Sequence, residues 1–140
     1  MTDSAMLTPM LALVAWTLVV WVWMYATRIP AIQAAGLDPG TIRQKSDLDV
    51  LPMKVRQVAD NYNHLHEQPV IFYALVTYCV LAGAADGLNV ALAWTYVGLR
   101  VVHSLVQCTI NFVPLRFAIF TLGTLALAAI TVRGLLALPG

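Results

Sequence analysis

Long apolar segments dominate this chain, and short polar stretches separate them. The hydrophobic pattern predicts four helices, at about residues 9–27, 53–83, 88–109 and 114–138. The first contains roughly 19 residues and rises about 28 Å, which is enough to cross the hydrocarbon core of a bilayer. We therefore expect an all-α fold, an integral membrane bundle of four helices that forms one domain over residues 1–140.

Prolines mark three of the predicted helices. Pro9 follows Thr8, a residue that can cap a helix, and Pro114 suits the first position of the last helix. Pro69 lies well inside the second predicted helix, where it removes a backbone donor and is expected to kink the helix.

The composition supports the membrane prediction. The chain is 60% hydrophobic and 11% charged, whereas a soluble domain carries about 25% charged residues. The net charge of +1 gives no sign of a nucleic-acid partner. Cys79 and Cys108 lie in apolar segments and are interpreted as small buried hydrophobic residues.

The basic residues predict the orientation in the membrane. Five of the eight lie in the polar loop at about residues 28–52 or just after it: Arg28, Arg43, Lys45, Lys54 and Arg56. The positive-inside rule therefore places this loop in the cytoplasm and both termini outside. The first residues carry no positive charge, so the first apolar segment is interpreted as a retained transmembrane helix rather than a signal peptide.

Three polar side chains share one face of the third predicted helix, which is otherwise mainly apolar. Arg100, His103 and Gln107 are spaced i, i+3 and i+7, so they share one side, and Arg116 opens the next helix nearby. Ionisable groups at membrane depth are functional-site candidates by default.

The second helix contributes further polar groups near the same boundary. Asn63 and Glu67 are four residues apart, and Arg56 lies about three turns before Glu67. Basic residues outnumber the acid, which suits an anionic ligand. Alternatively, Glu67 pairs with Arg100 and only holds two helices together. The two interpretations are compatible if the pair forms the floor of a site.

The histidines do not predict a metal site. His103 lies beside an arginine, whose charge repels a cation, and His64 and His66 diverge because they are two residues apart on a helix. No nucleophilic triad, phosphate loop or repeated broken helix is present in the sequence.

Two stretches resemble a known family. RVVH at Arg100–His103 followed by PLR at Pro114–Arg116 is similar to microsomal prostaglandin E synthase, and Asn63–Pro69 resembles the second-helix signature of the same family. This family is MAPEG, the membrane-associated proteins in eicosanoid and glutathione metabolism. The chain looks like a bacterial-type member, which implies the bacterial inner membrane.

The resemblance implies a homotrimer with glutathione bound between subunits near the cytoplasmic face. The residues that would contribute to the glutathione site are Arg56, Asn63, Glu67, Arg100, His103, Gln107 and Arg116. Glu67 would meet the amino group of glutathione, and Arg100 would support the site from below. Arg116 would be catalytic, facing the thiol or a carboxylate, and would stabilise a thiolate nucleophile.

Several positions depart from the family pattern. Glu67 is the fourth residue after Asn63 rather than the third. Gln107 stands where the family often has Tyr, and Phe117 stands where the prostaglandin synthase has Ser.

Two functions follow from the resemblance, and a third combines the trimer that the resemblance implies with the possible pairing of Arg100 and Glu67. The first is a glutathione-dependent transferase or peroxidase acting on lipophilic electrophiles that arrive from membrane lipid. The alternative is a non-enzymatic lipid-binding or scaffold protein of the same fold. The third is a structural trimer in which the pairing of Arg100 with Glu67 only specifies assembly.

Overall fold

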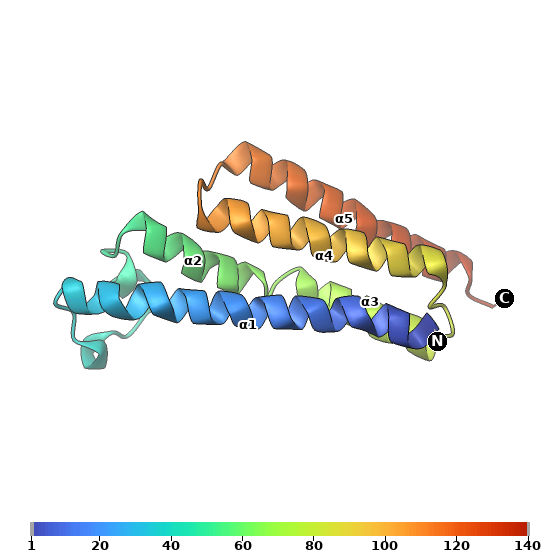
Figure 1. Cartoon of the computed structure of the whole chain (residues 1–140), viewed down its shortest axis with the longest axis horizontal. Helices are drawn as coiled ribbons and strands as arrows, with labels where there is room; N and C mark the ends of the chain where they lie inside the picture. Colours follow the sequence, from blue (N-terminus) through green and yellow to red (C-terminus); the bar gives the residue numbers. More distant parts are fainter. Residues whose placement is uncertain (1, 140) are drawn as a thin grey trace.

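The fold is an elongated helical bundle, seen in a computed structural model that describes residues 2–139. The five α-helices are α1 (Thr2–Ala34), α2 (Met53–His64), α3 (Pro69–Leu81), α4 (Gly87–Cys108) and α5 (Val113–Leu136), with short 3-10 turns η1 (Pro39–Thr41) and η2 (Lys45–Leu48). Helices α2 and α3 follow one another along α1, and α4 and α5 lie side by side (Figure 1). The all-α prediction is confirmed for the described residues.

The first helix is longer than predicted. It spans 33 residues, or about 50 Å, rather than residues 9–27. Pro9 and Pro30 both lie inside it, and Thr8 does not act as the cap but donates its hydroxyl to the Ser4 carbonyl at 2.8 Å. In a hydrocarbon environment the helix satisfies nearly all backbone groups by itself, so one missing donor does not end it. The polar loop therefore begins after Ala34.

The predicted second helix, residues 53–83, is two helices. The α-helical pattern stops at His64, and tighter turns follow, with Glu67 N–H donating to the His64 carbonyl at 3.1 Å. Pro69 then occupies the first position of α3, where its missing N–H costs little. The proline thus ends one helix and starts another, instead of kinking a continuous helix. Because of this break, the side chains of Glu67 and Gln68 point in directions that they could not take on a continuous straight helix.

A tight turn joins α4 to α5. Asn111 has φ of 50°, a left-handed conformation that Asn tolerates better than most residues, and its N–H donates to the Val106 carbonyl at 2.7 Å. The turn returns the chain so that α5 packs antiparallel to α4 (Figure 1). Arg116, one turn into α5, therefore lies at the same end of the bundle as the C-terminal half of α4.

The apolar core runs along the axis of the bundle. Phe72 and Tyr96 are its largest fully buried aromatic side chains, and their rings stack with centroids 4.9 Å apart. Leu13 and Val20 of α1 and Ile130 of α5 close the core from either side. Because lipid tails are as apolar as these side chains, close van der Waals packing rather than removal from water holds the helices together within a bilayer.

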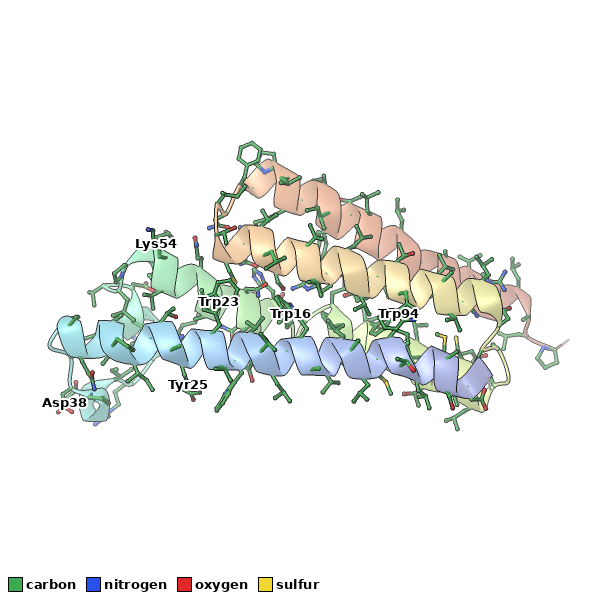
Figure 2. All side chains as sticks on the ribbon, in the orientation of Figure 1. Trp16, Trp23, Tyr25, Asp38, Lys54 and Trp94 are labelled. Carbon is green, nitrogen blue, oxygen red and sulfur yellow. The ribbon has the colours of Figure 1, made fainter. Side chains whose placement is uncertain are left out.

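Two helices, Asp3–Ala34 and Val113–Leu136, are long and apolar enough to cross a membrane. Only 28% of the residues in the apolar window of each are buried, so both present apolar side chains outward. Trp23 and Tyr25 lie on α1 towards the end that carries the polar loop (Figure 2), as expected of an interfacial aromatic belt.

The polar loop and the termini occupy opposite ends of the molecule (Figure 1). The loop is held by local contacts: Asp47 accepts backbone hydrogen bonds from Arg43 and Gln44, and these hold the pKa of its carboxyl below the usual range. At the other end, Asp86 caps α4 by accepting from Asn89 N–H at 2.8 Å. Arg133 contacts Asp86 and donates to Asn89 Oδ1 at 2.9 Å.

Candidate functional site

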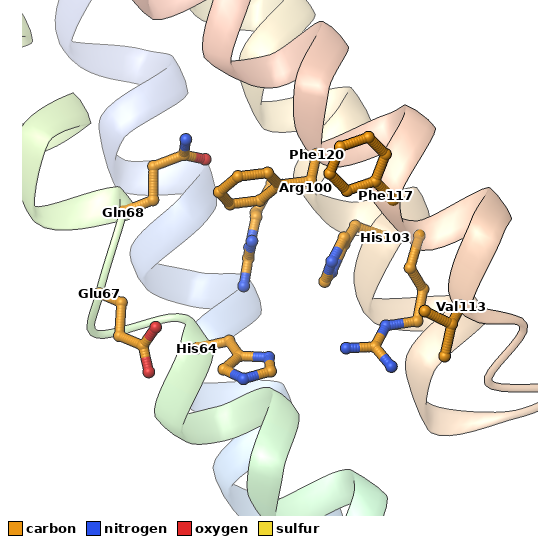
Figure 3. A pocket seen from close by; sticks show the side chains of 9 residues that line it. His64, Glu67, Gln68, Arg100, His103, Val113, Phe117 and Phe120 are labelled. Atoms are coloured by element: carbon orange, nitrogen blue, oxygen red, sulfur yellow. The ribbon is translucent and has the colours of Figure 1, made fainter.

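A cavity of about 330 Å³ opens where the break between α2 and α3 faces α4 and α5. Its walls come from three parts of the chain (Figure 3). The lining residues are His64, Glu67 and Gln68 from the break, Arg100 and His103 from α4, and Val113, Arg116, Phe117 and Phe120 from α5. Its volume lies within the range of small-molecule sites, about 300–1,000 Å³.

Arg100 forms the inner wall of the cavity. Its side chain is 4% exposed, and its guanidinium group points into the same space as the His64 ring (Figure 3). Among the residues that the structure describes, Arg100 has no ion pair, and its Nε and one terminal nitrogen have no hydrogen-bond partner. A buried charge without a counter-charge is expensive, so this group is a strong candidate to meet an anionic ligand.

His103 lies beside Arg100 on the same face of α4. It is 5% exposed, and its Nδ1 has no partner within residues 2–139. Its ring centroid lies 6.4 Å from that of Phe120. The i, i+3 spacing on the helix therefore places two nitrogen-bearing side chains next to each other in the cavity.

Arg116 supplies a second guanidinium group from α5. It is half-buried, and one terminal nitrogen donates to Asn111 Oδ1 at 2.7 Å. Its Nε is buried and has no partner in the described part of the chain. The contact to Asn111 fixes the side chain and leaves donors free for a ligand.

Glu67 is the one acid among the lining residues. It projects from the loop between α2 and α3 (Figure 3) and is exposed. The alternative in which Glu67 pairs with Arg100 is not supported, because the ion pairs of the described chain are Lys45–Asp60, Arg56–Asp49 and Arg133–Asp86. The loop backbone, rather than attraction between the two charges, sets the position of Glu67.

Gln68 closes the cavity next to Glu67. Its Nε2 donates to the Thr124 hydroxyl at 2.7 Å, and its Oε1 accepts from the Tyr96 hydroxyl at 3.1 Å. The Thr124 hydroxyl donates onward to the Phe120 carbonyl, so it needs a donor from Gln68. This chain of hydrogen bonds fixes the amide orientation and ties the break to α4 and α5.

His64 and Gln107 form a second polar contact at the cavity. Nδ1 of His64 lies 3.2 Å from Oε1 of Gln107, joining the end of α2 to α4. Gln107 is 2% exposed and lies behind His64 rather than on the cavity wall. His64 therefore reaches the cavity, and Gln107 holds its ring.

The cavity brings together two arginines, two histidines and one glutamate where the break between α2 and α3 meets α4 and α5. The model of the MAPEG family matches residues 6–136, nearly the whole chain.

The chain belongs to the MAPEG family.

Members of this family are membrane-associated, generally form oligomers and commonly use glutathione. No curated protein and no solved structure matches the chain. The resemblance found in the sequence is thus confirmed at the level of the family, which is membrane-associated, and two of the described helices are long and apolar enough to cross a membrane.

The structure separates the predicted site residues of this MAPEG protein into two groups. Those that line the cavity together are Glu67, Arg100, His103 and Arg116. Arg56 instead pairs with Asp49 at 3.5 Å, and Asn63 lies on a different hollow of about 440 Å³ beside α1 and the polar loop. Asn63 and Glu67 do not share a face because the helix ends between them.

Five lining residues are not among the site residues that the sequence predicts: His64, Gln68, Val113, Phe117 and Phe120. His64 lies inside the Asn63–Pro69 stretch that resembles the family signature, three residues before Glu67, and that position is the signal that points to it. Phe117 departs from the family pattern and lines the outer lip of the cavity. For the described residues, no group of three His, Cys, Asp or Glu side chains is placed to hold a metal ion.

Proposed function

We propose that this MAPEG protein is a glutathione-dependent transferase or peroxidase of the membrane that acts on lipophilic electrophiles. The observation that carries the proposal is Arg100, a guanidinium group that is 4% exposed, has no ion pair in residues 2–139 and faces the cavity. Leaving such a group without an anion is costly, and glutathione offers two carboxylates and an ionisable thiol.

The lining residues suit the chemical groups of glutathione. Glu67 is positioned to accept hydrogen bonds from the ammonium group of the peptide. Arg100 and His103 offer donors to a carboxylate at the inner wall, where low polarity strengthens charge-assisted hydrogen bonds. Arg116, nearer the opening, is left for the thiol. This distribution gives a partner to the ammonium group, to one of the two carboxylates and to the thiol.

Arg116 would provide the catalytic effect. A guanidinium group beside a thiol lowers the pKa of that thiol and raises the fraction present as thiolate, the nucleophilic form. The half-buried position of Arg116 limits screening by water, and its hydrogen bond to Asn111 holds it in place. In a peroxidase reaction, the same thiolate would attack a peroxide oxygen, so that an S–O bond forms while the O–O bond breaks and an alkoxide leaves as the alcohol; a second glutathione would then convert the sulfenic acid to the disulfide and water.

The outer lip of the cavity favours an electrophile that arrives from lipid. Val113, Phe117 and Phe120 are all exposed and line the open side on α5. Phe117 in particular is 70% exposed. Exposure of an apolar ring has a free-energy cost in water, and this cost is small where the ring contacts lipid acyl chains. The electrophile would approach along this apolar surface and meet the thiolate at Arg116.

A homotrimer would explain the two predicted site residues that lie away from the cavity. Arg56 and Asn63 point to the side of α2 near α1 and the polar loop, so a neighbouring copy could bring them to the cavity of the first. We place the polar loop in the cytoplasm and both termini outside, because four of the eight basic residues lie in the loop or just after it and Arg28 lies in the part of α1 that leads into it. The bacterial-type resemblance of the sequence supports a bacterial inner membrane.

Calorimetric titration of the detergent-purified oligomer with glutathione tests this function. We expect saturable binding at millimolar or lower glutathione, with ultraviolet absorbance of a thiolate, and conjugation of a lipophilic chloroarene. S-methylglutathione is the matched control, since it binds without forming a thiolate. Absence of both binding and thiolate absorbance at millimolar glutathione would refute the proposal.

A non-enzymatic lipid-binding role is the second candidate, and one observation favours it. An apolar hollow of about 290 Å³ lies between α3 and α5, lined mainly by Leu75, Tyr78, Ile130 and Leu135. A lipid that copurifies in stoichiometric amounts, without turnover that depends on a thiol, would support this role instead.

A further inference from the structure

His64 has a position in the cavity that neither the sequence motifs nor the proposed anion contacts explain. It is the last residue of α2, it is half-buried, and its ring points into the same space as the Arg100 guanidinium group (Figure 3). The ring is held from behind by Gln107, whose Oε1 lies 3.2 Å from Nδ1. A histidine that is both fixed and open to the cavity is suited to proton transfer.

The contact with Gln107 determines the tautomer of the ring. An amide oxygen only accepts hydrogen bonds, so Nδ1 of His64 must carry the hydrogen that it donates to Gln107 Oε1. In the neutral ring the other nitrogen, Nε2, then has a free lone pair. Gln107 thereby prepares His64 to accept a proton, as a carboxylate or carbonyl does for histidines in other sites.

A thiolate-forming cavity needs such an acceptor. Arg100 and Arg116 stabilise the thiolate but cannot take its proton, because guanidinium groups remain protonated. His103 lies between these cations and is 5% exposed, which disfavours a second positive charge there. Glu67 is assigned to the ammonium group of the peptide. His64 is farther from the inner wall and partly open to water, so it can pass the proton on.

We propose that His64 is the general base for the bound thiol, an inference that rests on the glutathione-dependent function proposed above. The S–H bond breaks, its electron pair stays on sulfur, and the proton forms an N–H bond at Nε2 of His64. With chlorodinitrobenzene as the electrophile, the thiolate forms the C–S bond and chloride leaves with the electrons of the C–Cl bond. The imidazolium then releases its proton to water and returns to the starting state.

The test compares His64→Ala and His64→Gln with the wild-type oligomer, using glutathione and chlorodinitrobenzene. General-base catalysis contributes about 10²–10⁴-fold, so we expect kcat/KM at neutral pH to fall by about 100-fold or more. Glutathione affinity, measured by calorimetry, should change little. Added imidazole should restore part of the rate in His64→Ala, because it can occupy the vacated space. His66→Ala is the matched control, since His66 Nδ1 contacts the Tyr62 carbonyl outside the cavity lining.

Variants of Gln107 provide a second test of the proposed role of His64. Gln107→Glu keeps an oxygen acceptor for Nδ1–H and should retain most of the activity, whereas Gln107→Leu removes the acceptor and should lower the rate without rescue by imidazole.

The outcomes separate the two proposals. If His64→Ala binds glutathione but keeps the wild-type rate, or if imidazole fails to rescue its lost rate, His64 is not the base and the glutathione-dependent function stands. If the wild type neither binds nor turns over glutathione, the proposed function fails, and the role of His64 falls with it.

Discussion

Gln68 donates from Nε2 to the Thr124 hydroxyl at 2.7 Å and so ties the break between α2 and α3 to the middle of α5. The same amide accepts from Tyr96, a side chain that is 1% exposed. One residue of the loop thus holds the wall of the cavity to two helices. This makes the cavity a property of the bundle rather than of a mobile loop.

Gln68→Met should destabilise the protein through Tyr96. Methionine fills a similar volume but leaves the buried Tyr96 hydroxyl without an acceptor, which costs about 1–3 kcal/mol. Thermal unfolding in detergent would show a lowered midpoint. Thr124→Val removes the hydrogen bond from Gln68 and the one from the Thr124 hydroxyl to the Phe120 carbonyl, but it leaves the Tyr96 hydroxyl with its acceptor and should have a smaller effect. Equal losses in the two variants would contradict the special role of Tyr96.

Arg100→Met should separate ligand binding from stability. Without glutathione, the variant should be as stable as the wild type or more stable, because methionine removes a buried charge that forms no ion pair in the described chain. Glutathione affinity should fall at least tenfold, since a hydrogen bond to a charged group contributes about 1.5–3 kcal/mol.

Arg100→Lys is the control for this variant. It keeps the charge but not the planar fork of donors, so we expect an intermediate affinity. A large loss of stability in Arg100→Met with glutathione affinity unchanged would show that the arginine is structural.

Acid stability should depend on Asp86 at the end of the molecule that carries the termini. The Asn89 backbone N–H, followed by Arg133, holds the pKa of the Asp86 carboxyl below its usual value. Because the folded pKa is lowered, the stabilisation is fully present at neutral pH. It is lost as the pH falls below about 3.9, the ordinary value, through the folded pKa.

Asp86→Ser keeps an oxygen that can accept from Asn89 N–H but does not titrate. Its unfolding midpoint should therefore vary less with pH over this acidic range than that of the wild type. A variant curve that parallels the wild-type curve would assign the acid sensitivity to other carboxylates.

Gly123 of α5 faces the buried Tyr96 ring. A Cβ added there would lie 3.4 Å from Tyr96 Cε1, an ordinary contact. Gly123→Ala should therefore be tolerated, and removal of a helical glycine can stabilise by up to about 1 kcal/mol. Gly123→Leu should push Tyr96 away from Gln68 and lower both the unfolding midpoint and the glutathione affinity. Wild-type behaviour of the leucine variant would show that the two helices separate easily.

The apolar segments and the polar face of α4 could be predicted from the sequence alone. Arg100, His103 and Gln107 lie on one side because a helix repeats every 3.6 residues, whatever it packs against. The family resemblance could also be recognised from the sequence, because it rests on short runs of residues whose spacing is fixed by local backbone geometry.

Only the tertiary structure decided which partner each polar side chain meets. Gln107 shares a face of α4 with Arg100, yet its side chain contacts His64. Arg56 forms an ion pair with Asp49. The tertiary structure also decided the break before Pro69. A proline can either kink a helix or begin a new one, and here α3 begins at Pro69 because it packs against α1 and α5. Helical register is a local property, whereas contacts between helices depend on how segments distant in the chain pack together.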